Sequence, residues 1–155
     1  SSSDEHIKTW DQISTIVTEL KNKKRNIVFT NGCFDILHIG HIKYLEKAKS
    51  FGDILILGLN SDESVQRLKG DNRPINPQDD RAYLLASLEA VDYVVIFNED
   101  TPYDLISIVQ PDILAKGGDY EGKKVVGQDI AKELKLITFI DGKSTTKTIE
   151  RIQKL

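Results

Sequence analysis

The sequence predicts an α/β fold, a doubly wound parallel sheet of five strands with helices on both faces. Two observations support this fold class. Short apolar runs alternate with amphipathic segments along the 155 residues, with no internal repeat and no linker, which is typical of parallel sheets crossed by helices. One run, 53–60, is apolar almost throughout, as expected of a strand buried on both faces. Because ligands of such sheets bind beyond the carboxyl ends of the strands, we expect the functional site at that edge.

The strands are marked by short apolar runs between glycine, proline or charged residues. We expect them at 27–29, 53–60, 93–97, 112–115 and 136–140. Helices fill the intervals, where apolar residues recur at steps of three and four or a capping residue precedes a helix-forming run. We expect them at 4–25, 42–48, 61–68, 77–88, 102–110 and 127–134, with a last one after residue 146.

Three of these helix starts have recognisable caps. Asn60, with Glu63 three residues later, is expected to cap the helix at 61–68. Asn76 and Thr101 each stand before a proline, which favours the first helical position. The first helix is amphipathic, so we expect it to pack one face onto the body. We therefore divide the chain into an N-terminal helix, 1–25, and the main part of one domain, 26–155.

The composition indicates a globular chain and excludes several functions. Hydrophobic residues make up 39% and charged residues 29%, as in ordinary soluble domains. The net charge of −3 argues against a nucleic-acid surface, which needs a basic excess. We find no secretion signal and no apolar run near the roughly 20 residues of a membrane span, and expect a cytoplasmic protein with no membrane partner. The single Cys33 excludes a disulfide within the chain and a cysteine-built zinc site.

The stretch from Thr30 to His41 is where we expect the function. It reads Thr-Asn-Gly-Cys-Phe-Asp-Ile-Leu-His-Ile-Gly-His and joins the first strand to the next helix. Free backbone N–H groups and the helix dipole make such a junction suited to phosphate. His38 and His41, two of the three histidines, lie in it.

Four loops should meet at the carboxyl edge of the sheet: 30–41, 69–76, 116–120 and 141–147. Each carries glycine together with a cation or hydroxyl groups. Beyond the histidines they supply Lys69 and Arg73, then Lys116 with Gly117 and Gly118, then Lys143 with Ser144, Thr145 and Thr146. Four such loops predict a pocket for a polyphosphate.

Other phosphate and metal motifs do not fit. Gly142-Lys143-Ser144 resembles the end of a Walker A loop, but position 137 is isoleucine where the motif needs glycine. No Gly-x-Gly-x-x-Gly follows the first strand. His38 and His41 are three residues apart, unlike the zinc-protease spacing. We therefore expect no protein-built metal site.

The segment Phe34–His41, ending in His-Ile-Gly-His, resembles the first signature of the cytidylyltransferase-like nucleotidyltransferase superfamily. Ser144-Thr145-Thr146 before a helix resembles the second. The resemblance narrows to the adenylyltransferase half of bifunctional heptose kinase/adenylyltransferases. It rests on stretches at 67–74, 88–92, 99–102 and 116–120, and covers roughly 26–153. Because the 155 residues hold no sugar-kinase sequence, we expect a stand-alone adenylyltransferase.

This resemblance implies a Rossmann-like fold and an activity. ATP would react with D-glycero-D-manno-heptose 1-phosphate to give ADP-heptose and pyrophosphate, for the synthesis of lipopolysaccharide or related glycan precursors. Mg²⁺ would be bound mainly through the nucleotide phosphates. A phosphate monoester is already largely anionic at pH 7 because its second pKa is about 6. The reaction then needs alignment and charge neutralisation instead of a general base.

The resemblance also implies roles for individual residues. The catalytic set is His38, His41 and Lys69. The nucleotide-binding set is Thr30, Asn31, Gly32, Cys33, Phe34, Gly40, His41, Lys116, Gly117, Ser144, Thr145 and Thr146. The substrate-binding set is Asp35, Asn60, Asp62, Arg73, Arg81, Gly118 and Asp119. His38 and His41 are expected to donate N–H groups to phosphate oxygens.

Two other functions stay open at this point. A cytidylyltransferase would use CTP and glycerol 3-phosphate or another alcohol phosphate, although such enzymes carry an arginine shortly before their Ser-Thr-Thr motif and 139–142 contains none. A nucleotide-binding regulatory module without turnover is the second alternative. The amphipathic N-terminal helix also makes a homodimer an expectation.

Overall fold

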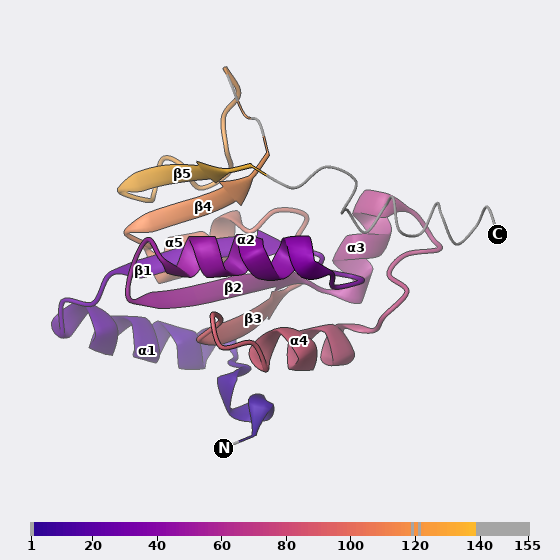
Figure 1. Ribbon diagram of the computed structural model, residues 1–155, viewed down its shortest axis with the longest axis horizontal. Helices are drawn as coiled ribbons and strands as arrows, with labels where there is room; N and C mark the ends of the chain where they lie inside the picture. The colour runs from indigo at the N-terminus through magenta and orange to yellow at the C-terminus, as the bar shows by residue number, and fades with distance from the viewer. Residues whose placement is uncertain (1, 119, 121, 139–155) are drawn as a thin grey trace.

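A five-stranded parallel sheet in the order β3-β2-β1-β4-β5 forms the centre of the protein (Figure 1). The structure, a computed structural model, describes residues 2–118, 120 and 122–138. The strands are β1 (Ile27–Gly32), β2 (Ile54–Asn60), β3 (Tyr93–Phe97), β4 (Ile113–Gly117) and β5 (Glu133–Ile137). The chain builds outward from β1 to β3, then returns to add β4 and β5 on the other side. The predicted doubly wound sheet is confirmed.

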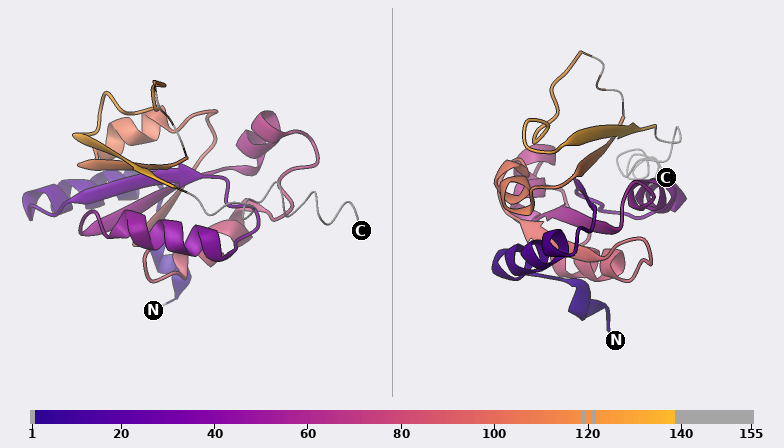
Figure 2. Two further views of the ribbon diagram at one scale, coloured as in Figure 1. Left: turned by 45° about the horizontal axis from the view of Figure 1, so that its top comes forward. Right: turned by 90° about the vertical axis from the view of Figure 1, so that its left-hand side faces the viewer.

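Helices cover both faces of this sheet (Figure 2). After a short 3₁₀ turn, η1 (Ser3–His6), they are α1 (Trp10–Asn22), α2 (Ile39–Lys49), α3 (Asp62–Lys69), α4 (Gln78–Ala86) and α5 (Tyr103–Val109). α2 and α4 pack on one face, and α1 and α5 on the other. Among the helices of the described residues, none combines the length and apolarity needed to cross a membrane.

Side chains of the central strand alternate between the two layers. Val28 packs in the layer of α2 and α4, whereas Ile27 and Phe29 pack in the layer of α1 and α5. All three are fully buried. The two-residue period of a strand, combined with helices on both faces, explains why strands such as β2 read as almost unbroken apolar runs.

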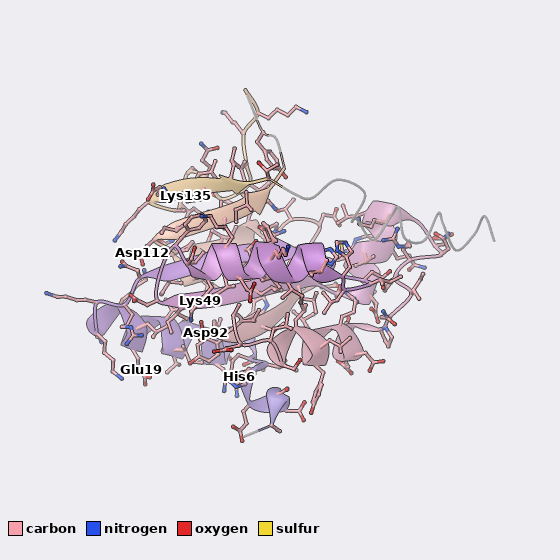
Figure 3. All side chains as sticks on the ribbon, in the orientation of Figure 1. His6, Glu19, Lys49, Asp92, Asp112 and Lys135 are labelled. Carbon is pink, nitrogen blue, oxygen red and sulfur yellow. The ribbon has the colours of Figure 1, made fainter. Side chains whose placement is uncertain are left out.

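Three aspartates fasten the amino ends of neighbouring strands to one another. Each aspartate lies just before one strand. Its carboxylate accepts a hydrogen bond from a backbone N–H at the start of the neighbouring strand. The bonds join Asn26 N to Asp53 Oδ2, Ile27 N to Asp112 Oδ2 and Leu55 N to Asp92 Oδ2, at 2.7, 2.8 and 2.7 Å. Figure 3 labels Asp92 and Asp112 at this edge. These bonds tie the amino edge of the sheet together.

Helix starts differ from the predictions by a residue or more. Ser61, not Asn60, caps α3, because its hydroxyl accepts from Ser64 N at 3.1 Å. Pro77 and Pro102 are themselves the cap residues of α4 and α5. Asn76 does not cap α4, since its backbone N and side-chain amide donate to the first loop instead.

The first helix is shorter than predicted. Thr9 caps α1 through a reciprocal capping box with Gln12. Before it, Ile7 forms a parallel bridge to Val94 of β3, and Lys8 N donates to Val94 O at 2.9 Å. The pairing with β3 keeps this part of the chain extended, so helix formation begins only at Trp10.

The helix predicted at 127–134 is wrong. Residues 126–130 form turns, and β5 begins at Glu133, three residues before the predicted strand start. Gly127 has φ +87°, a left-handed conformation that interrupts an α-helix, and a Cβ there would lie 2.6 Å from Ile106 Cδ1. Pairing with β4 then holds the following residues as a strand.

We predict that Asp92→Ala lowers the free energy of unfolding by about 1–3 kcal/mol, because the buried Leu55 N–H loses its acceptor. Lys49 Nζ, 2.5 Å from Asp92 Oδ2, loses its partner as well. Urea denaturation measures the loss. The control is Asp100→Ala, which breaks an exposed pair with Arg67 and should cost less than about 1 kcal/mol. Equal losses in the two variants would contradict the role given to Asp92.

Candidate active site at the carboxyl ends of β1 and β4

The order of the strands reverses between β1 and β4, where a doubly wound sheet opens a crevice at its carboxyl edge. The two strands are paired only as far as Phe29 and Leu114. β1 continues to Gly32 and β4 to Gly117 without further pairing to each other. The last residues of both strands therefore line a gap, and α2 begins beside it.

The start of α2 carries both predicted catalytic histidines. His38 is the N-cap of the helix, and Gly40 and His41 lie in its first turn. His38 Nδ1 accepts from Gly40 N at 3.1 Å, and His41 Nδ1 accepts from His38 N at 3.3 Å. The rings are stacked, with centroids 3.9 Å apart and an interplanar angle of 22°. Two backbone amides at the helix start are therefore satisfied by imidazoles.

These contacts fix the protonation of the two rings. A ring nitrogen that accepts from a backbone N–H carries no proton, so each neutral imidazole carries its proton on Nε2. Burial, followed by the neighbouring His38, lowers the pKa of His41 to about 4. At pH 7 His41 is therefore a neutral ring whose only N–H donor is Nε2–H.

Asp35 ties the second loop to the first. Its side chain is 0% exposed, and it accepts from Ile75 N at 2.8 Å, Asn76 N at 2.8 Å and Arg73 Nε at 3.3 Å. The Asn76 side chain in turn donates from Nδ2 to the backbone Asp35 O at 2.6 Å. These protein contacts favour a bracing role for Asp35 over direct contact with substrate.

Arg73 is a buried cation at this edge, and one of its guanidinium nitrogens makes no hydrogen bond to the described residues. The residue is 8% exposed and pairs with Asp35 through Nε. Its Nη2 is buried and has no hydrogen-bond partner among the described residues. A buried guanidinium nitrogen of this kind is a natural donor to an anionic ligand.

Arg81 joins four segments around the crevice. It is 1% exposed, and four of its N–H groups reach protein oxygens. They donate to Asn76 O, Cys33 O, Asn60 O and Asp62 Oδ1 at 2.9, 2.7, 2.9 and 2.8 Å. The predicted substrate residues Asn60, Asp62 and Arg81 thus lie together, with Arg81 donating to both of the others. This arrangement favours a role in shaping the site.

On the other side of the crevice, Lys116 Nζ donates to Asn31 Oδ1 at 2.9 Å. Burial lowers the pKa of the Lys116 amine. Burial also raises the pKa of the Cys33 thiol, against the influence of Lys69 and other nearby cations. Cys33 is therefore a thiol at neutral pH and is not an activated nucleophile.

The other predicted residues divide between this edge and the part of the chain that is not described. Gly32 must lack a side chain, because a Cβ there would lie 2.7 Å from the Phe34 ring. Lys69 is exposed at the end of α3. Thr30, Gly117 and Gly118 lie at or just beyond the carboxyl ends of β1 and β4, and Gly40 lies in the first turn of α2. Asp119, Ser144, Thr145 and Thr146 lie outside the described residues.

Sequence reasoning did not single out Tyr44. Its side chain is buried, and its hydroxyl bonds to Thr30 Oγ1 at 2.6 Å and to Ala115 O at 3.2 Å. The one available signal was its spacing, three residues after His41 and thus on the same side of the helix.

A cavity of about 760 Å³ lies beside the carboxyl end of β3. Its lining includes the carboxylates of Asp62, Glu63, Asp79 and Glu99. Carboxylates repel a polyphosphate. The crevice between β1 and β4, with its cations and imidazole donors, is better suited to phosphate than this cavity.

We predict that Asp35→Ala destabilises the fold by about 3–5 kcal/mol, since Arg73 is left as an unpaired buried charge. Chemical denaturation measures the change. Adding Arg73→Ala should restore part of the loss, because the double variant removes both charges. A single-variant loss below about 1 kcal/mol would contradict the bracing role.

We predict that the His41 ring titrates near pH 4 in the folded protein, against 6.5 ordinarily. Between these values the unfolded chain binds a proton that the folded chain does not. Stability is therefore fully present above pH 6.5 and falls as the pH drops toward 4. Proton NMR follows the ring, with His41→Ala assigning its resonance. A midpoint near 6.5 would contradict the buried, neutral ring.

Three comparisons place this geometry among known proteins. The family model described as cytidylyltransferase-like matches residues 29–153. Over 154 residues the chain is 68% identical to the bifunctional protein HldE of Aliarcobacter butzleri, covering 99% of this chain and 32% of that protein. The HldE of Nitratiruptor sp. is 69% identical over 150 residues, with coverage of 97% and 32%. The chain thus spans about a third of the length of these curated relatives.

Solved structures agree with the sequence comparisons. A lipopolysaccharide core biosynthesis protein from Thermoplasma volcanium is 31% identical with a TM-score of 0.60, covering 75% of this chain and 97% of that one. Pantoate-beta-alanine ligase from Francisella tularensis shares the fold, with 17% identity, a TM-score of 0.62 and coverage of 96% and 79%. With the match over 29–153, these findings establish that the chain belongs to the cytidylyltransferase-like family of nucleotidyltransferases.

Proposed function

We propose that the protein transfers AMP from ATP to D-glycero-D-manno-heptose 1-phosphate, giving ADP-heptose and pyrophosphate. The observation that carries this proposal is the pair of neutral imidazoles at the start of α2, beside the crevice between β1 and β4. The similarity to HldE proteins and to a lipopolysaccharide core biosynthesis protein supports a sugar phosphate as the acceptor. The product would feed lipopolysaccharide or related glycan synthesis. That the domain acts alone stays a prediction.

The acceptor needs no general base. Its phosphate monoester is largely ionised at pH 7, so its oxygen attacks the α-phosphorus directly. As the new P–O bond forms, the bond to the β-phosphate breaks and pyrophosphate leaves with the electron pair. His38 and His41 donate Nε2–H to phosphate oxygens, which stabilises the charge in the transition state. A neutral His41 suits this task, because protonation would remove the Nδ1 acceptor that orients it.

Cations around the crevice complete the charge balance. Arg73 contributes its buried Nη2, Lys116 its partly desolvated amine, and Lys69 an exposed amine at the end of α3. We assign them to the phosphates of ATP and of the acceptor. The hydroxyls of Ser144, Thr145 and Thr146 are proposed to hold the β- and γ-phosphates, on the strength of the family resemblance.

Mg²⁺ would accompany the triphosphate. The described residues hold no cluster of three or more histidine, cysteine or carboxylate groups able to bind a metal. Asp35 and Asp62, two of the carboxylates at this edge, bond to protein donors. These residues fit a metal carried mainly by phosphates and water, which would neutralise charge on the departing pyrophosphate. We place the reaction in the cytoplasm, with ATP and the sugar phosphate as partners, and homodimer formation stays a prediction.

A release assay for pyrophosphate tests the proposal. ATP and CTP are each paired with heptose 1-phosphates and with glycerol 3-phosphate, with Mg²⁺ present. We expect rapid release only with ATP and the heptose 1-phosphate, and none after chelation of the metal. Preference for CTP with glycerol 3-phosphate would establish the cytidylyltransferase function that the family description also allows. Tight ATP binding with no release from any pair would favour a regulatory module.

We predict that His41→Ala lowers kcat by ~10²–10³, because one donor to the transition state is lost. Steady-state pyrophosphate release measures the change. The control is His6→Ala, since His6 bonds to Asp92 O at the opposite edge of the sheet and its loss should leave kcat unchanged. A loss below about tenfold in His41→Ala would overturn the transition-state role.

A further inference from the structure

We propose that Tyr44 is a positioning residue for the transfer reaction. Its hydroxyl connects the helix that carries the two histidines to both strands of the crevice. This inference rests on the proposed function and adds a residue that contacts neither substrate. Three observations support it. β1 and β4 separate after Phe29 and Leu114, the Tyr44 hydroxyl bridges them there, and Tyr44 lies one turn from His41 on α2.

The strands separate at the position that Tyr44 bridges. The pairing of β1 with β4 stops at Phe29 and Leu114. The next residue of each strand is Thr30 and Ala115, and the Tyr44 hydroxyl lies between them. It donates to Ala115 O at 3.2 Å and therefore accepts from Thr30 Oγ1 at 2.6 Å. The Tyr44 hydroxyl thus links the two strands at the first position where they have no backbone pairing.

A second bridge holds the same gap one residue further on. Lys116 Nζ donates to Asn31 Oδ1 at 2.9 Å. Successive side chains of a strand point to opposite faces, so this bridge crosses on the face opposite Tyr44. The gap between the strands is thereby set on both faces of the sheet.

Tyr44 also relates this gap to the histidines. It follows His41 by three residues, so the two side chains lie on one side of α2 about one turn apart. Tyr44 is 5% exposed, and Thr30 and Ala115 are each 0% exposed. Burial raises the pKa of Tyr44 to about 12, so the hydroxyl stays protonated. The bond to Ala115 therefore ties α2 to β4 about one turn beyond His41.

In-line transfer depends on the position of α2 relative to β4. Under the proposed function, the imidazoles on α2 and the Lys116 amine at the end of β4 act on the same phosphates. A displacement of about 1 Å between such groups is enough to lower the rate by ~10². A phenylalanine would fill the same space but would remove the bond to Ala115 O. α2 would then keep its apolar packing, but no hydrogen bond from residue 44 would fix its position relative to β4.

The kinetic test is Tyr44→Phe, assayed by pyrophosphate release at a temperature where circular dichroism shows every variant folded. We expect kcat to fall about tenfold or more, with KM for ATP changed less than about threefold, since alignment is lost and the ligand contacts remain. The matched control is Tyr103→Phe, which removes a hydroxyl bond to Asp129 on the surface. The control should keep both constants.

A double-mutant cycle tests whether the two hydroxyls act as one bridge. Thr30→Val removes the other side-chain partner. If the bridge is a unit, the double variant Tyr44→Phe/Thr30→Val should be about as slow as the slower single variant. Losses that multiply would show two independent effects and overturn the bridge.

Histidine NMR gives a readout that does not depend on activity. In Tyr44→Phe without substrate, the ring resonances of His38 and His41 should shift or broaden, while those of His6, at the opposite edge, stay in place. Unchanged His38 and His41 resonances, or an unchanged kcat in Tyr44→Phe when the wild-type enzyme is active, would overturn the positioning role. Wild-type inactivity with every pair of substrates would instead overturn the proposed function, and the resonances would still test the bridge.

Discussion

The reversal of strand order between β1 and β4 is the constraint on which the rest of the structure depends. α2, which follows β1, packs on one face of the sheet, and α5, which leads into β4, packs on the other. The strands separate after Phe29 and Leu114. The crevice exists because of this topology, and the loops that follow parallel strands collect around it.

The cationic side chains at this crevice are only partly paired with acidic groups of the protein. Arg73 keeps a buried nitrogen without a partner among the described residues, and burial lowers the pKa of Lys116. Both conditions are costly in the free protein, and an anionic ligand at this edge would relieve them. The net charge of −3 therefore says little about the ligand, because part of the acidic charge lies elsewhere, as in the cavity beside β3.

Much of this could be predicted from the sequence, and the failures have physical causes. Strand runs were recognisable because burial on both faces leaves apolar stretches, and His38, Arg73 and Lys116 were grouped because their loops were all expected at the carboxyl edge of the sheet. The false helix at 127–134 arose because the left-handed Gly127 packs against Ile106, which is a tertiary contact. The role of Tyr44 depends on Ala115, 71 residues away, and no local pattern shows such a partner.

The central claim is that the start of α2 and the ends of β1 and β4 form one phosphate site with neutral imidazole donors. A crystal structure with a non-hydrolysable ATP analogue and Mg²⁺ tests it most directly. The account predicts an α-phosphate oxygen within hydrogen-bond distance of His41 Nε2, with the triphosphate at the carboxyl ends of β1 and β4. A triphosphate bound away from α2, with His41 Nε2 bonded to protein alone, would contradict it.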